Sequence, residues 1–161
     1  MPGTNLTREE AAARAAPVTV DTHDADPDVT TGPEAFATRS TIRFTCGEPG
    51  SETFVDFVGG EVLGITLNGV SLDPATHYSD SRVRLPGLAA QNVAVVTATG
   101  RYTNTGEGLH RFVDPVDDEV YLYSQFEVPD SRRMYPVFEQ PDLKASFSFT
   151  VTAPAHWQVV S

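Results

Sequence analysis

Short stretches in which apolar and polar side chains alternate recur along most of this chain, and they limit its fold more than any other feature. Successive side chains of a β-strand point to opposite faces of the sheet, so alternation predicts strands with one buried face. Asn68 and Gly69 lie between two such stretches and supply the positive-φ positions of a type I′ turn, which predicts a hairpin. The alternating stretches occupy residues 38–46, 53–58, 82–85, 93–99, 119–127 and 144–154.

Turn residues separate these stretches, and roughly eight to ten short strands are typical of an antiparallel sandwich or of curved antiparallel sheets. Only the start of the chain predicts a helix: Thr7 and Glu10 have the spacing of a capping box, and Pro17 ends the alanine-rich run that follows. The next stretch, HDADPDV, is acidic and contains Pro27, which predicts an edge strand or a mobile segment. No repeat and no low-complexity linker interrupts the chain, so we expect a single β domain over residues 1–161.

Net charge excludes several classes of partner. The chain carries 22 acidic and 11 basic residues, for a net charge of -11. Such a field repels nucleic acid and anionic lipid surfaces. The single cysteine, Cys46, forms no internal disulfide and has apolar neighbours on its face, which indicates a buried thiol. No apolar run approaches the ~20 residues of a membrane span, and the first residues are not a signal peptide, so we expect a cytoplasmic protein.

The sequence lacks the common catalytic motifs. Its four histidines are isolated from one another, whereas a zinc hydrolase motif places two of them one helical turn apart. It contains no GxSxG elbow, no phosphate-binding loop and no GxGxxG motif. The acidic stretch VDPVDDEV could offer calcium the side chains of Asp114, Asp117, Asp118 and Glu119, but it lacks the glycine and the distal glutamate of an EF-hand. A solvated loop is the favoured interpretation.

Gln125 and Glu127 form the most informative polar pair. They stand two apart in the apolar run YLYSQFEV, so in a strand they project from one face with Phe126 on the other. On a solvent-facing surface they are an ordinary polar pair. Facing a cavity, they form a clamp with one negative charge, suited to a small cation such as the α-ammonium group of a peptide. The pattern alone leaves both interpretations open.

The stretches around this pair resemble a known family. YTNTGEGLHRF (residues 102–112) and YLYSQFEVPDSRRMYPVFEQPDLKASFSFTVTAP (residues 121–154) are similar to the M1 family of zinc aminopeptidases, in its bacterial aminopeptidase N branch. The opening MPGTNLTREEAAARA and the hairpin followed by RLPGL resemble the same branch. The resemblance is strong over residues 102–154 and weaker over residues 22–81. The GAMEN and HExxH motifs of the family's catalytic domain do not occur in this chain.

The resemblance implies the amino-terminal domain of such an enzyme, a saddle of β-sheets without its catalytic partner. Gln125 would line the pocket for the first side chain and contact the substrate amine, and Glu127 would help to hold the α-ammonium group. Such a clamp for the substrate amine would make the enzyme an exopeptidase that removes N-terminal residues. Zinc and the water-activating glutamate would belong to the absent catalytic domain, so residues 1–161 alone would be inactive. Arg132, Arg133 and the FEQPD segment (residues 138–142) would hold the turn that carries the pair.

Two further hypotheses stay open. The chain could be a free-standing β-sandwich binding or interaction module that kept the family's sheets and lost catalysis. It could also be an independent hydrolase that uses the acidic loop and a histidine, such as Asp117 with His110, although no constellation of residues supports that. The last residues, HWQVVS, look like a strand with no turn or polar tail after it, which favours a fragment of a longer protein.

Overall fold

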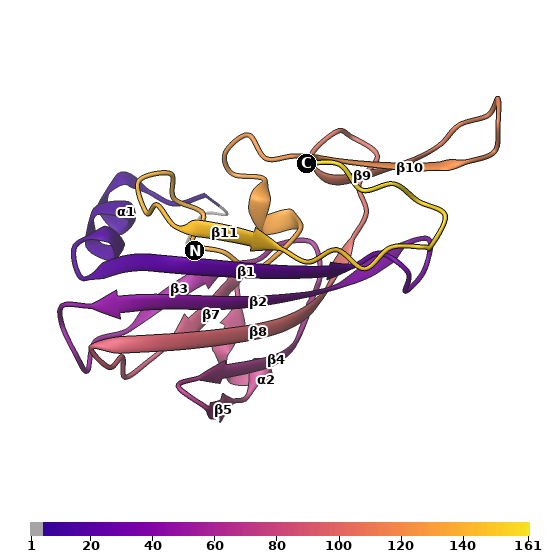
Figure 1. Ribbon diagram of the computed structural model, residues 1–161. Helices are drawn as coiled ribbons and strands as arrows, with labels where there is room; N and C mark the ends of the chain where they lie inside the picture. The colour runs from indigo at the N-terminus through magenta and orange to yellow at the C-terminus, as the bar shows by residue number, and fades with distance from the viewer. Residues whose placement is uncertain (1–4) are drawn as a thin grey trace.

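Three β-sheets form the framework of the protein, as the computed structural model of residues 5–161 shows (Figure 1). Six strands form the largest sheet in the order β11-β1-β2-β8-β4-β5, three form a second sheet in the order β3-β7-β6, and β9 pairs with β10. The strands are β1 (Val18–Asp28), β2 (Ala35–Cys46), β3 (Thr53–Asp56), β4 (Glu61–Leu67), β5 (Val70–Leu72), β6 (Tyr78–Ser79), β7 (Arg82–Leu85), β8 (Gln91–Arg101), β9 (Gly108–Val113), β10 (Val120–Gln125) and β11 (Ser146–Phe149). The predicted fold class, mainly β with curved sheets and a short N-terminal helix, is confirmed.

The main hydrophobic core lies between the six-stranded and the three-stranded sheets. In Figure 1, β3 and β7 lie behind β1, β2 and β8. Alternate residues of the central strands, such as β2 and β8, face this core, as the sequence pattern predicts. The thiol of Cys46 is buried at its margin. The largest fully buried side chains of this core are Phe44, Phe57, Ile42, Ile65, Leu85 and Leu88.

Local signals correctly predicted the helix and the hairpin. Helix α1 (Arg8–Ala15) starts at Thr7, whose hydroxyl accepts from the Glu10 amide while the Glu10 carboxylate accepts from the Thr7 amide. Asn68 and Gly69 have φ angles of 53° and 81° between β4 and β5. Two short helices complete the elements, α2 (Pro74–His77) and η1 (Ser131–Arg133). No helix among residues 5–161 is long and apolar enough to cross a membrane.

The prediction of an edge strand or a mobile segment for the acidic stretch is wrong. Strand β1 lies inside the sheet, antiparallel to β2 and parallel to β11. Its buried positions, His23, Ala25 and Pro27, alternate with partly exposed aspartates, so the acidic side chains occupy the outer face. Pro27 does not interrupt the pairing with β2, where it lies opposite Thr38, and on the β11 side its carbonyl accepts from the Thr152 amide at 2.9 Å. The partner strand is more than a hundred residues away, which no local pattern reveals.

The β9–β10 hairpin extends away from the two packed sheets (Figure 1). A second, smaller core joins its base to the large sheet and to the segment after η1. The buried members of that core are Ala25, Phe36, Leu109, Met134, Tyr135 and Val137. The hairpin is the element that ends at Gln125, so its base fixes the position of the candidate site.

Strand β11 is less buried than its alternating sequence predicts. Phe147 and Phe149 stack on each other, with ring centroids 6.2 Å apart, and both pack on buried rings of the neighbouring segments. Even so, they are 47% and 46% exposed. One edge of β11 pairs with β1, and no other strand of residues 5–161 pairs with its second edge.

Candidate functional site

Gln125 and Glu127 lie next to each other at the end of β10, and both side chains are exposed. The strand ends at Gln125, two residues earlier than its alternating sequence suggests. Gln125 Oε1 accepts a hydrogen bond from the Glu127 backbone amide at 3.1 Å, which folds the amide side chain over the turn. The structure thus brings the two predicted residues together, on an open surface. Ser124 lines a hollow of about 560 Å³ between β10 and residues 156–160, and neither member of the pair lies in it.

Phe126, between the two polar residues, anchors this segment. Its ring makes an edge-on contact with Tyr135, with centroids 5.7 Å apart. Tyr135 is buried, and burial raises the pKa of its phenol. The Tyr135 ring also packs edge-on against His23 at 5.3 Å and Phe149 at 5.6 Å. An aromatic cluster built from three distant segments therefore holds the apolar side of the site, while the amide and the carboxylate remain accessible.

The turn after Glu127 is tied to η1. The Asp130 amide donates to the Glu127 carbonyl at 3.0 Å, and the Asp130 carboxylate accepts from Arg133 Nε at 2.7 Å. Arg133 also forms an ion pair with Glu107 at 3.2 Å. Gly108 faces Gln125 across the hairpin with a φ of 63°, and a Cβ atom at Gly108 would stand 2.6 Å from Arg133 Cβ. Both observations require glycine at this position.

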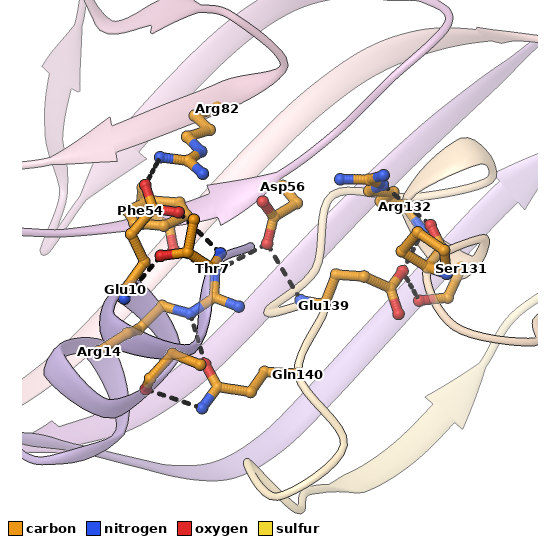
Figure 2. A network of polar contacts seen from close by, with 12 residues as sticks. Thr7, Glu10, Arg14, Phe54, Asp56, Arg82, Ser131, Arg132, Glu139 and Gln140 are labelled. Carbon is orange, nitrogen blue, oxygen red and sulfur yellow. Dashed lines mark hydrogen bonds and ion pairs between the residues drawn. The ribbon is translucent and has the colours of Figure 1, made fainter. Parts of the chain in front are cut away.

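A buried polar network lies behind the turn, and Figure 2 shows it between α1 and η1. Arg14 of α1 forms an ion pair with Asp56 at 2.7 Å, and both side chains are almost fully buried. The Glu139 carboxylate accepts from the Ser131 hydroxyl and, at 2.7 Å, from the Arg132 amide. The sequence predicts a supporting role for Arg132, Arg133 and the FEQPD segment (residues 138–142), but it does not reveal Arg14 and Asp56. The only signal was a basic residue inside an alanine-rich helix.

The other candidate residues do not converge. His23 is buried, His77 and His110 are partly buried at separate places, and His156 is exposed. In the acidic loop, the Asp114 and Asp117 carboxylates accept from nearby backbone amides at 2.8 and 2.9 Å, which makes it a hydrogen-bonded turn. Among residues 5–161 no group of three or more histidine, cysteine, aspartate or glutamate side chains could hold a metal ion.

The fold and the exposed pair first define a class of protein: a β-rich module whose candidate residues lie on an open surface. Comparison with known proteins then gives the family. The family model described as "Peptidase M1 N-terminal domain" matches residues 22–161, so the chain belongs to this family.

Two named relatives support this assignment. The chain is 57% identical to Aminopeptidase N of Streptomyces lividans over 164 aligned residues, which cover 100% of the chain and 19% of that protein. It is 28% identical to Aminopeptidase N of Acetobacter pasteurianus over 136 residues, which cover 76% of the chain and 37% of that protein. The chain thus spans about a fifth and about a third of the lengths of these two relatives.

A solved structure has the same fold. The structure of native yeast LTA4 hydrolase matches with a TM-score of 0.68 and 16% identity, over 85% of this chain and 23% of that one. At this identity the likeness concerns the fold alone. The predicted family, the amino-terminal domain of M1 aminopeptidases, is confirmed by the family model and the bacterial relatives.

Proposed function

We propose that residues 1–161 form most of the amino-terminal domain of a cytoplasmic zinc aminopeptidase, and that Gln125 and Glu127 bind the amino terminus of its peptide substrate. The observation that carries this proposal is the placement of the pair. An amide and a carboxylate side chain, two residues apart, are both exposed on a turn that Phe126 anchors to Tyr135. The partners are then the peptide amino terminus and the catalytic domain, with neither nucleic acid nor a membrane.

The chemistry of the pair fits an α-ammonium group. This group offers three N–H donors and one positive charge, which a carboxylate and an amide oxygen can share. Glu127 is solvated in the domain by itself. Once a second domain covers it, an unpaired carboxylate would be costly, and a free peptide amine would supply the missing counter-charge. An internal peptide bond has no such charge, so the pair selects chain ends.

The described residues do not form a zinc site, so the metal would be held by the catalytic domain. There it would polarise the peptide carbonyl and supply the attacking hydroxide when bound. In this scheme residues 1–161 bind and orient the substrate amine and carry out no proton transfer. The domain by itself would be inactive.

Exposed apolar side chains favour this proposal over a free-standing binding module. Of the fourteen large apolar side chains exposed in residues 5–161, all but Leu63, Val70 and Val93 lie beyond residue 110. They occupy the β9–β10 hairpin, the turn after it, β11 and the last residues. Large exposed apolar areas mark contact surfaces. A module that works alone would be expected to expose fewer of them on one side.

The test replaces Glu127 in the full-length enzyme. Glu127→Gln keeps the size of the side chain and removes its charge, so we expect a raised KM for aminoacyl anilides and a loss in kcat/KM corresponding to roughly 1.5–3 kcal/mol. Glu119→Gln is the matched control, because Glu119 is an exposed glutamate near the start of the same strand. Unchanged kinetics for Glu127→Gln would refute the assigned role.

A further inference from the structure

Helix α1 contacts the segment behind the candidate site mainly through the buried side chain of Arg14 and through hydrogen bonds with Gln140. The match to the family model begins at residue 22, so α1 lies before the matched region. Arg14 is the only buried residue of the helix, which adds no side chain to either hydrophobic core. Apolar packing therefore does not explain why the helix lies against the sheets. The buried charge of Arg14 calls for another explanation.

We propose that α1 positions the Gln125–Glu127 turn, and that Arg14 is the positioning residue through which it acts. This inference rests on the proposed function of that pair. It assigns to α1 a part in substrate binding, although none of its residues lies at the site. Three successive sets of contacts connect the helix to the turn, and Figure 2 shows the first two.

In the first step Arg14 joins the helix to two other segments. Its Nη1 atom lies 2.7 Å from Asp56 Oδ2 at the end of β3, and its Nε atom donates to Gln140 Oε1 at 2.9 Å. Gln140 Nε2 in turn donates to the carbonyl of Ala11, one turn earlier in the helix, at 2.9 Å. The guanidinium group also lies over the ring of Phe54, 4.7 Å from its centroid. Its orientation is therefore fixed by charge, by hydrogen bonds and by a ring.

In the second step one carboxylate oxygen of Asp56 contacts both α1 and the segment that carries Glu139. Asp56 Oδ2, which pairs with Arg14, also accepts from the Glu139 amide at 3.2 Å. The Glu139 side chain then points back toward η1, where it accepts from the Ser131 hydroxyl and the Arg132 amide. Displacement of Arg14 would leave the Asp56 charge buried without its cation, which is a costly state. The segment that carries Glu139 would then have to shift.

In the third step η1 fixes the turn. Arg132 Nε donates to the Pro129 carbonyl at 2.9 Å, and Arg132 Nη2 donates to Asn5 Oδ1 at 2.7 Å, so the residues before α1 hold the turn as well. The Asp130 amide then donates to the Glu127 carbonyl. A displacement of about 1 Å at a binding group can reduce catalysis about a hundredfold, so even a small shift of η1 would be measurable.

The experiment uses the full-length enzyme and two competitive inhibitors, a tripeptide analogue with a non-hydrolysable ketomethylene group in place of its first peptide bond, and the same analogue without its α-amino group. The ratio of their inhibition constants measures how strongly the site recognises the amine. Arg14→Met removes the buried cation and keeps an apolar side chain of similar length. Arg84→Met is the matched control, because Arg84 forms an exposed ion pair with Glu52 at 3.1 Å. Gln140→Met is a milder second variant, which removes the hydrogen bonds of Gln140 with Arg14 Nε and with the Ala11 carbonyl and leaves the Arg14–Asp56 pair in place.

We expect Arg14→Met to reduce the inhibition ratio about tenfold or more, Gln140→Met to reduce it less, and Arg84→Met to leave it unchanged. Hydrogen exchange should accelerate at amides 126–133 and stay the same in β2 and β8. A merely structural role would weaken both inhibitors equally and leave their ratio unchanged. If Arg14→Met fails to fold, Gln140→Met decides, and an unchanged ratio in it overturns the inference.

Glu127→Gln separates this inference from the function on which it rests. If the inhibition ratio falls in this variant but is unchanged in Arg14→Met and Gln140→Met, the proposed role of Gln125 and Glu127 is correct and the role of α1 is wrong. If the inhibition ratio is unchanged in Glu127→Gln, the proposed function of the pair is wrong. The role of α1 in positioning the pair is then wrong as well.

Discussion

A buried histidine makes the stability of this chain depend on pH between about 6.5 and 4. His23 is 1% exposed and stacks on Phe147, with ring centroids 4.9 Å apart. Ser40 donates its hydroxyl hydrogen to the Pro136 carbonyl at 2.7 Å, so its oxygen accepts from His23 Nε2–H at 3.1 Å. Burial lowers the pKa of His23 from 6.5 to about 4, against the smaller raising effect of Asp24.

The sign and size of the effect follow from linkage. Between pH 6.5 and 4 the unfolded chain binds a proton at His23 and the folded chain does not, so stability falls as the pH falls through this range. One pKa unit corresponds to about 1.4 kcal/mol, so the interval corresponds to about 3 kcal/mol. Wild-type protein should lose that much more stability than His23→Phe, which keeps a ring in the stack and cannot be protonated.

The assay is urea unfolding followed by circular dichroism at pH 7, 5.5 and 4, with the free energy of unfolding compared between wild type and variant. His156→Phe is the control, because His156 is exposed and its replacement should leave the pH dependence unchanged. Carboxylates titrate in all three proteins and cancel in the difference. If wild type and His23→Phe lose stability in parallel between pH 7 and 4, the argument from burial is wrong.

Two further predictions concern single positions. Gly108→Ala should destabilise the chain by about 1–3 kcal/mol in urea unfolding, because alanine is strained at a φ of 63° and its Cβ atom would collide with Arg133; a neutral result would contradict the close approach. The hydrogen bond from Arg82 lowers the pKa of Glu10 from 4.5 to about 2, so this pair stabilises the fold fully above pH 4.5 and loses its effect as the pH falls through 2. Glu10→Gln should therefore be less stable than wild type at pH 6 and approach it near pH 2, and a constant difference would disprove this.

Local sequence signals correctly predicted the structures that depend on residues close to one another along the chain. The capping box of Thr7 and Glu10 and the turn at Asn68 and Gly69 involve residues close in sequence, and both formed as expected. The end of β10 at Gln125 was missed, because the glutamine side chain caps the strand by accepting from the next turn, which alternation does not reveal.

Contacts between distant segments could not be predicted. The acidic residues and Pro27 of HDADPDV predict an edge strand or a mobile segment, and no local pattern reveals that the partner β11 lies near the other end of the chain. Arg14 and Asp56 are 42 residues apart, and Glu139 lies a further 83 residues on. The candidate pair itself, Gln125 and Glu127, came from a family resemblance together with the two-residue spacing, and its substrate role stays a prediction.

The parallel pairing of β1 with β11 has a consequence for synthesis on the ribosome. Strand β1 emerges early and can pair with β2 at once, but its other edge stays open until residues 146–149 have been made. An open strand edge invites pairing with other chains. Asp24, Asp26 and Asp28 lie along this strand, and charges on an exposed edge oppose such pairing. The acidic residues that made β1 look like a poor strand would then protect the nascent chain from aggregation until its last partner arrives.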